Sequence, residues 1–429
     1  MSIRAFSGGG LGPFGLSLAY LRQNRLATSL NLLLLALGVA AIAGLALIDH
    51  QMQGRLTRDV AGIDLVVGAK GSPLQLILSS VYQADVPTGN VPLSTLDDLR
   101  RNPLVKQAIP VAMGDSYHGF RIVGTTADYP AHYQAALAQG RMFATAMEAT
   151  VGASVARTAN LHVGDSFAGS HGLTPGGEVH AHSPYTVVGI LAPTGTVVDR
   201  LVLTPVESVW AVHDHHHHHH DDGDDDDHDG DHDADHAGDH AAEAGAQPPR
   251  EVTAILVRYA SPLAAARLPR AINSETGAQA ASPAVELVRL MSLLGAGLDA
   301  FRAVGVLLVV TSALGTFVAL TNALQQRRYD LAVMRSLGAS RARIVIQIGV
   351  EALLVSGAGT VAGLALAHGG IALFALLSPK ARDFGLSPFT LVPADLGLLG
   401  LGIAVAAVAA ALPAVQAYRT DVARTLARG

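Results

Sequence analysis

The fold is decided by residues Leu26 to Ile48, which read L-A-T-S-L-N-L-L-L-L-A-L-G-V-A-A-I-A-G-L-A-L-I. These 23 residues contain no charged side chain. A membrane hydrocarbon core of about 30 Å needs roughly 20 apolar residues in one helix, so the stretch is long enough to span a membrane. The 25 residues before it include three arginines, whereas a cleaved signal peptide has a shorter apolar core near its start. We therefore predict an uncleaved membrane anchor.

Three further apolar runs lie in the C-terminal third of the chain. Residues 301–324 form a run of similar length, and residues 396–412 form a shorter one that ends at Pro413. Residues 344–377 are interrupted by only two ionisable side chains. We predict one long or tilted helix there, because two antiparallel spans would need a turn for which the chain has no room. The four runs predict four membrane-spanning helices, and the alternative is that they are core helices of a large soluble protein.

The distribution of arginine predicts how these spans are oriented. Cytoplasmic segments that flank membrane helices are enriched in Lys and Arg. The flanking arginines are Arg4, Arg22 and Arg25 before the first run, Arg327, Arg328, Arg335, Arg341 and Arg343 between the second and third, and Arg419, Arg424 and Arg428 after the fourth. All three groups lie on one side of a four-span topology. We therefore predict a multi-pass protein of the cell inner (plasma) membrane with both termini in the cytoplasm, and this asymmetry argues against the soluble alternative.

The predicted topology divides the chain into spans and connecting segments. Residues 49–300 form one large extracytoplasmic domain, inserted between the first span (26–48) and the second (301–324). Residues 378–395 form a short loop on the same side. The expected cytoplasmic segments are residues 1–25, which are amphipathic, residues 325–343 and residues 413–429.

Short apolar and alternating segments within the extracytoplasmic domain predict strands. They lie at residues 63–68, 120–124, 185–191 and 252–259. Helix starts are interleaved with them: Ser94 and Asp97 have the spacing of an N-terminal cap, and Ser261-Pro262 opens another helix. The predicted fold class is therefore an α-helical membrane protein with four transmembrane helices and a large α+β domain between helices 1 and 2.

The composition excludes several classes of protein. Of the 429 residues, 50% are hydrophobic and 15% are charged, whereas soluble domains carry roughly 25% charge. This excludes a disordered chain and a nucleic-acid partner, and it disfavours a soluble enzyme. The absence of cysteine excludes disulfides, thiolate metal sites and a cysteine nucleophile.

The sequence contains no catalytic motif. Neither G-x-S-x-G nor H-E-x-x-H occurs. The only lysines are Lys70, Lys106 and Lys380, and none follows a glycine as the phosphate-binding motif G-K-[ST] requires. We predict a non-catalytic membrane subunit, with any ATP bound and hydrolysed by a separate partner chain.

A tract rich in histidine and aspartate lies in the extracytoplasmic domain. Residues 213–240 hold 12 of the 35 acidic residues and 11 of the 19 histidines, so the net charge of −6 arises there. Residues 213–249 contain no large apolar side chain, which predicts a disordered loop. Imidazoles and carboxylates together bind divalent metals. The candidate ligands are His213, His215, His216, His217, His218, His219, His220, His228, His232, His236 and His240, with Asp214, Asp221 and Asp222.

We predict that this tract binds Zn²⁺ or another divalent transition metal loosely and exchanges it quickly, with no tightly bound cofactor. A solvated linker without function is the main alternative, and an expression tag is disfavoured because the Asp-His repeats continue beyond the six consecutive histidines. Weaker candidate ligands are His171, His180 and His182, which in the alternative are ordinary surface histidines.

The third span carries two ionisable residues and a glycine motif. Glu351 and His368 are intramembrane, which predicts an interior-facing or functional role, although Glu351 is close enough to the helix start to reach the membrane surface. The motif G-T-V-A-G, Gly359 to Gly363, lets helices approach closely. It suits a dimer interface or packing within one chain.

The loop between the second and third spans, residues 325–344, reads Q-Q-R-R-Y-D-L-A-V-M-R-S-L-G-A-S-R-A-R-I. Apolar residues at Leu331, Met334 and Leu337 predict a short helix with one apolar edge, ended by Gly338. One interpretation is a loop that binds anionic lipid. The sequence also resembles the R-R-x-E-I-x-x-x-R-x-x-G-A-S-R signature of the FtsX-like or MacB-type (type VII) permeases of ABC transporters.

Four other segments are similar to the same family. They are L-A-Y-L-R-Q-N-R-L-A-T-S-L (18–30), G-A-S-V-A-R-T-A-N-L-H-V-G-D-S-F (152–167) of a MacB-like periplasmic core domain, E-A-L-L-V-S-G-A-G (351–359) and L-P-A-V-Q-A-Y-R-T-D (412–421). Two positions depart from the family pattern: Asp330 replaces a glutamate, and Val422 replaces a proline.

The resemblance implies a permease that works with a cytoplasmic ABC ATPase and with a second permease copy, identical or not. It implies that ATP-driven closure moves the periplasmic domains, which act on a substrate or on a periplasmic binding protein or lipoprotein. The residues that it assigns to ATPase coupling are Arg327, Arg328, Asp330, Leu331, Met334, Arg335, Gly338 and Ala339.

Several functions remain in competition at the level of sequence. The His/Asp tract favours zinc handling, whereas lipoprotein release or peptide and macrolide efflux would leave the tract incidental. An ion-motive metal carrier predicts several intramembrane carboxylates and histidines, and the spans contain only Glu351 and His368. A membrane-anchored binding protein without transport would need no cytoplasmic docking loop.

Overall fold

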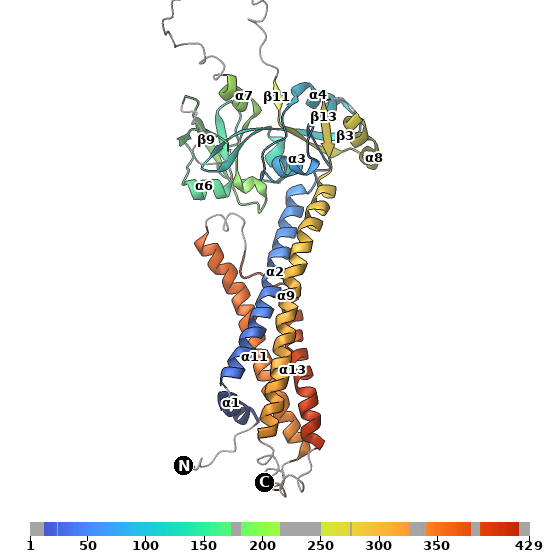
Figure 1. Cartoon of the computed structure of the whole chain (residues 1–429). Coiled ribbons are helices and arrows are strands. Elements are labelled where there is room, and N and C mark those ends of the chain that lie inside the picture. The colour runs from blue at the N-terminus through green and yellow to red at the C-terminus, as the bar shows by residue number, and fades with distance from the viewer. Residues whose placement is uncertain are drawn as a thin grey trace, which may run out of the picture. The chain divides into compact units, whose positions relative to one another are not determined.

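Each of the four apolar runs forms one long helix (Figure 1). These helices are α2 (Arg25–Val60), α9 (Pro283–Gln326), α11 (Arg341–Leu377) and α13 (Pro393–Arg419), and the shorter α1 (Pro13–Gln23) precedes them. All four are long and apolar enough to cross a membrane, which confirms the prediction of four membrane-capable helices. The computed structural model describes residues 13–23, 25–172, 182–214, 250–274, 277–326, 336, 338, 340–378 and 387–419.

The chain divides into two compact units. The first, which we call the helix unit, comprises residues 1–53 and 293–429, and the second, the mixed unit, comprises residues 54–292. Both limits of the mixed unit fall inside helices, because α2 continues to Val60 and α9 begins at Pro283.

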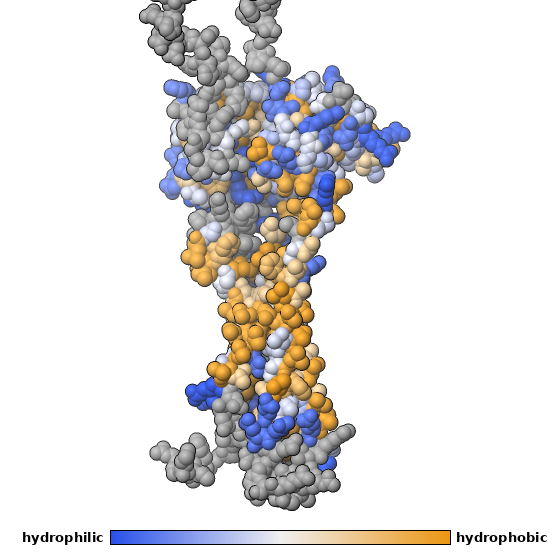
Figure 2. All heavy atoms as spheres, in the orientation of Figure 1, coloured by the Kyte–Doolittle hydropathy of each residue, from blue (hydrophilic) through white to orange (hydrophobic). Residues whose placement is uncertain are grey.

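Small and branched side chains fill the contacts between the helices of the helix unit. One buried cluster joins Leu35 and Val39 of α2 to Val309 of α9 and Val405 of α13. The outward faces are also apolar: Leu377 is 74% exposed, and Figure 2 shows hydrophobic side chains over the middle of the visible face of this unit. Apolar residues on both the inside and the outside are typical of a membrane-embedded bundle.

The last helix differs from the prediction at its C-terminal end. The sequence predicts that the fourth span ends at Pro413, but α13 continues past this proline to Arg419. Proline removes one helical hydrogen bond. Ala410 and Ala417, on either side of it, are buried in a cluster with Leu320 of α9 and Ile344 of α11, and this packing offsets the loss.

The mixed unit is built on one sheet with both parallel and antiparallel pairs. Its strand order is β13-β1-β12-β3-β4-β10-β6-β9-β5, and β11 pairs separately with β2. The strands are β1 (Leu65–Ala69), β2 (Val91–Pro92), β3 (Val105–Tyr117), β4 (Phe120–Thr125), β5 (Leu137–Gly140), β6 (Glu148–Val151), β7 (Ser166–Phe167), β8 (Ser170–His171), β9 (Tyr185–Leu191), β10 (Leu201–Pro205), β11 (Glu251–Val252), β12 (Ala254–Tyr259) and β13 (Ala278–Ala281).

Short helices pack on this sheet. They are α3 (Pro73–Ser80), α4 (Leu93–Arg101), α5 (Asp128–His132), α6 (Ala153–Ala159), η1 (Val197–Arg200), α7 (Val206–Asp214) and α8 (Pro262–Ser274). All four predicted strands are present, and α8 opens at Pro262 as predicted. Ser94 does not cap α4, because the helix already begins at Leu93 after Pro92 and makes no side-chain cap bond.

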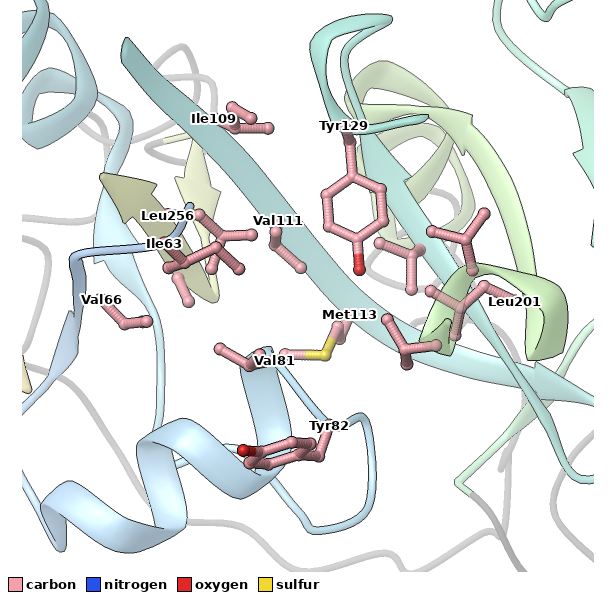
Figure 3. Close-up of a cluster of buried hydrophobic side chains, with 14 of the residues drawn as sticks. Ile63, Val66, Val81, Tyr82, Ile109, Val111, Met113, Tyr129, Leu201 and Leu256 are labelled. Carbon is pink, nitrogen blue, oxygen red and sulfur yellow. The ribbon is translucent and has the colours of Figure 1, made fainter. Parts of the chain in front are cut away.

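Strand β3 is long enough to serve both halves of the sheet. Its first half pairs with β12 and its second half with β4, so Val111 and Met113 lie in the middle of the largest core cluster (Figure 3). Tyr129 and Leu201 pack there from one half, and Val66 and Leu256 from the other. The core is therefore continuous across the mixed unit.

We expect His132 to make an acid-sensitive contribution to the stability of the mixed unit. Burial lowers the pKa of this imidazole below its ordinary value of 6.5, and the charge of Arg258 lowers it further, although the Ala61 backbone opposes the shift. The folded state therefore takes up this proton less readily than the unfolded chain, so the stabilisation is complete above pH 6.5 and is lost as the pH falls toward the folded pKa. Urea unfolding from about pH 8 to about pH 5 measures this slope.

A His132→Gln variant is the control for this prediction, since its side chain has no proton to gain. The pH slope of the unfolding free energy is expected to be smaller in this variant than in the parent. Equal slopes in the two proteins would show that other groups cause the acid sensitivity.

Candidate functional site

The predicted coupling loop is described at only one of its candidate residues. Gly338 has φ +96°, the left-handed conformation in which glycine ends helices. Two residues later, Ser340 caps α11, because its Oγ accepts a hydrogen bond from the Arg343 backbone N–H at 3.3 Å. The other candidates lie outside the described residues, and they are Arg327, Arg328, Asp330, Leu331, Met334, Arg335 and Ala339.

Glu351 faces the interior of the helix unit. Its residue is 7% exposed, and it lines a cavity of about 170 Å³ together with Asn31 of α2 and Thr316 of α9. Beside this cavity, the Ser312 hydroxyl donates a hydrogen bond to the Asn31 carbonyl at 2.9 Å, which links α9 to α2. Of the two sequence alternatives, the interior position is therefore correct. An ionisable group among polar groups from three helices is typical of a functional position in a membrane protein.

The glycine motif of α11 contacts a helix of the same chain. A Cβ atom added at Gly359 would lie 2.9 Å from a methyl group of Leu35, and one added at Gly363 would lie 2.6 Å from Val39 Cβ. Both neighbours belong to α2. The motif therefore packs within the chain, which is the second of the two sequence interpretations.

His368 takes part in a polar cluster where α11 and α13 approach their connecting loop. Its Nδ1–H donates to the Pro388 carbonyl at 2.6 Å, and its Nε2 lies 3.5 Å from Asp395 Oδ2. Asp395 is 6% exposed and accepts a hydrogen bond from the Val392 backbone N–H at 2.9 Å, which caps α13. Gln51 of α2 exchanges two hydrogen bonds with the Ser387 backbone, at 2.8 and 2.9 Å. These bonds hold the loop end to two helices.

Within the mixed unit, the end of α2 is bonded to two different loops. The buried Asp59 carboxylate accepts a hydrogen bond from the Val197 backbone N–H at 2.8 Å, and the Asp59 carbonyl accepts one from the Tyr133 hydroxyl at 3.0 Å. One turn earlier, the Leu56 carbonyl accepts a bond from the Tyr82 hydroxyl at 3.2 Å. The last turn of α2 is therefore part of the core of this unit.

The two flanks of the His/Asp tract meet in the structure. Trp210 of α7 donates from Nε1 to the Glu251 carbonyl at 2.7 Å, and the Arg250 guanidinium lies 5.1 Å from the Trp210 ring centre. This Trp210 stem joins the last helix before the tract to the first strand after it. Stacking of an arginine on an indole stabilises such a contact.

The candidate metal ligands are largely outside the described residues. His213 and Asp214 end α7, His171 ends β8 and His182 is exposed before β9, while His180 and the tract from His215 onward are not described. Within the described ranges, no three His, Cys, Asp or Glu residues lie close enough together to hold a metal ion. The metal hypothesis remains a prediction from sequence.

Two family models match this chain, and together they include most of its residues. The model of the MacB-like periplasmic core domain matches residues 28–274, and the model of the FtsX-like permease C-terminal region matches residues 302–422. The chain belongs to the FtsX-like permeases with a MacB-like periplasmic core domain. The family resemblance of the sequence motifs is thereby confirmed. A search of curated proteins returned no match to the chain.

Two solved structures are similar to this FtsX-like permease. One is the periplasmic region of MacB from Actinobacillus actinomycetemcomitans. The match covers 55% of this chain and 95% of the MacB chain, with 11% identity and a TM-score of 0.34. The other is the extracellular domain of the noncanonic ABC-type transporter YknZ from Gram-positive bacteria. The match covers 50% of this chain and 98% of the YknZ chain, with 13% identity and a TM-score of 0.29. The family assignment rests on the two sequence matches.

Membership makes the chain a permease subunit of an ABC transporter, a kind of protein that works with a cytoplasmic ABC ATPase. Four residues of this FtsX-like permease that hold its elements together escaped the sequence analysis: Gln51, Asp59, Trp210 and Asp395. Only Asp395 carried a local signal, since it stands two residues after Pro393 at the start of an apolar run, which is the spacing of a helix cap.

Proposed function

We propose that this permease couples ATP hydrolysis by a separate cytoplasmic subunit to a conformational change of its periplasmic domain. The observation that carries the proposal is the presence, in one chain, of both family regions together with four helices able to span a membrane. The predicted coupling residues, from Arg327 to Ala339, would receive the motion of the ATPase.

In the proposed topology both termini are cytoplasmic, and residues 49–300 are inserted on the periplasmic side between the first and second spans of the inner membrane. The arginine distribution supports this orientation. Helices α2 and α9 each contain residues of both units without a break in the helix.

A second permease copy, identical or not, and a periplasmic binding protein or lipoprotein are the other proposed partners. Because Gly359 and Gly363 already contact α2, a dimer interface would use other faces of the helix unit. Lipoprotein release or peptide and macrolide efflux is the alternative function within the family.

We further propose that the transport process is linked to zinc or a similar divalent metal. The His/Asp tract supplies 11 imidazoles and 12 carboxylates within 28 residues. Neutral imidazole and carboxylate oxygen are both good zinc ligands, and the negative charge attracts cations. The Trp210 stem would keep the tract attached to the folded domain at both flanks.

An Arg335→Glu variant tests the coupling assignment. We expect co-purification with the cognate ABC ATPase to fall by at least about tenfold, because the new carboxylate replaces a cation at a charged interface. Quantitative pull-down of the ATPase from detergent extracts measures the effect.

The matched control is Arg267→Glu, which makes the same charge change on an exposed residue of α8 in the mixed unit. This variant is expected to retain the ATPase. Equal retention by both variants would contradict the docking assignment, and loss of ATPase by both would indicate a general effect of charge.

A further inference from the structure

A groove in the helix unit combines apolar walls with two arginines. It has a volume of about 550 Å³ and lies among α1, α2 and α11. Its apolar wall includes Leu18, Leu32, Leu354 and Ala358. Arg22 and Arg25, both exposed, lie at the same groove.

Hydrogen bonds join α1 to the two other helices that line the groove. The Gln347 side-chain amide of α11 donates to the Ser17 hydroxyl of α1 at 2.7 Å, and Ser17 is fully buried. The Thr28 hydroxyl of α2 lies 3.4 Å from the Leu21 carbonyl of α1, to which it donates. Helix α1 is therefore attached to both of its neighbours.

The charge of the groove is positive. Arg25 Nε donates to the Arg22 carbonyl at 3.0 Å, which directs the Arg25 side chain back toward the end of α1. Among the described residues that line the groove there is no carboxylate. Figure 2 shows hydrophilic side chains at the lower end of the helix unit, where α1 lies in Figure 1, next to the hydrophobic surface.

These features match the two parts of a phospholipid. A guanidinium binds phosphate oxygens with paired hydrogen bonds, and basic residues at a membrane surface each favour anionic lipid by about 1 kcal/mol. The apolar wall fits an acyl chain. A second copy of the protein fits less well, because a symmetric contact through this groove would bring four arginines together.

We propose that this groove binds one phospholipid with an anionic headgroup, its phosphate between Arg22 and Arg25 and its acyl chain along Leu354 and Ala358. The inference does not depend on the transported substrate, on the ATPase or on the zinc hypothesis. Bound lipid would tie α1 to α2 and α11, so it would stabilise the helix unit.

The test uses the purified full chain in detergent with phosphatidylglycerol, phosphatidylcholine or glycerol phosphate alone. Native mass spectrometry and thermal unfolding measure lipid binding and its effect on stability. We expect only phosphatidylglycerol to bind tightly and raise the unfolding temperature. The double variant Arg22→Gln with Arg25→Gln is expected to bind it roughly thirtyfold more weakly, which corresponds to about 2 kcal/mol.

Two controls keep the proposal falsifiable. Arg341→Gln with Arg343→Gln removes the same charge from the start of α11, outside the groove, and is expected to bind lipid normally. Ala358→Trp fills the apolar wall and is expected to weaken binding, whereas Ala365→Trp on the exposed surface of α11 is not.

Three results would overturn the proposal. The first is equal binding of phosphatidylglycerol and phosphatidylcholine by the parent protein. The second is equal binding of phosphatidylglycerol by the groove double variant (Arg22→Gln with Arg25→Gln) and by the control double variant (Arg341→Gln with Arg343→Gln). The third is a change of oligomeric mass, without a change of lipid binding, in the groove double variant, which would assign the groove to a second copy of the chain.

Discussion

Replacement of Gly363 by leucine is expected to disrupt the packing of α11 on α2 and to destabilise the helix unit by about 3 kcal/mol, the upper end for overpacking. The added Cβ would lie 2.6 Å from Val39 Cβ and 2.7 Å from the Ala36 carbonyl oxygen. A backbone oxygen cannot rotate away, so the two helices must separate. Thermal unfolding of the full chain in detergent measures the loss, and ATPase stimulation is expected to fall with it.

Gly357→Leu is the matched control on the same helix. A Cβ at Gly357 meets no described atom within 4 Å, so this variant is expected to unfold at or above the temperature of the parent. Two results would contradict this assignment: greater destabilisation by Gly357→Leu than by Gly363→Leu, or dissociation of a dimer by Gly357→Leu alone. Either result would indicate that the glycines of α11 pack against a second copy of the chain.

Replacement of residues 215–240 by a Gly/Ser linker of equal length is expected to remove most of the zinc-binding capacity of the protein. The exchange deletes ten of the 11 tract histidines while leaving α7 and the Trp210 stem intact. Equilibrium dialysis with metal analysis measures the bound zinc. The unfolding temperature without metal is expected to stay unchanged, because the exchange leaves the described core of the mixed unit intact.

A triple variant, His171→Ala with His180→Ala and His182→Ala, is the control and is expected to keep most of the zinc. ATPase rates of the permease complex at increasing Zn²⁺ then separate metal-linked transport from an incidental tract. Zinc binding that survives the linker exchange would contradict the metal hypothesis, and an identical zinc response of the ATPase would leave the tract without a role in transport.

Local sequence properties were sufficient to predict the long helices and several strands of the sheet. The run from Leu26 to Ile48 is a helix because it lacks charged residues over a membrane-spanning length, whatever it packs against. Residues Tyr185–Leu191 form a strand with the predicted bounds, since alternating and β-branched residues favour it. Pro413 was misleading because the cost of a proline depends on the packing around it.

The pairing of side chains was beyond local reasoning. The sequence predicted that His368 lies within a membrane span, but it did not predict its neighbour Asp395 on another helix. The sequence also did not predict the hydrogen bonds between Gln51 and Ser387, which are 336 residues apart. Such contacts depend on how each helix is rotated about its axis, which a run of uniformly apolar residues does not encode.

By itself, the sequence determined that this protein has four membrane-capable helices, a domain of helices and strands, the motifs of an FtsX-like permease and a separate tract rich in histidine and aspartate. These properties follow from hydrophobicity, periodicity and short motifs, which act over a few turns of chain. Only the tertiary structure decided that Glu351 faces inward, that Gly359 and Gly363 pack on α2, and that Arg22 and Arg25 share a groove with residues of α11. Those contacts join residues far apart in the chain, and their geometry is set by the close packing of whole helices.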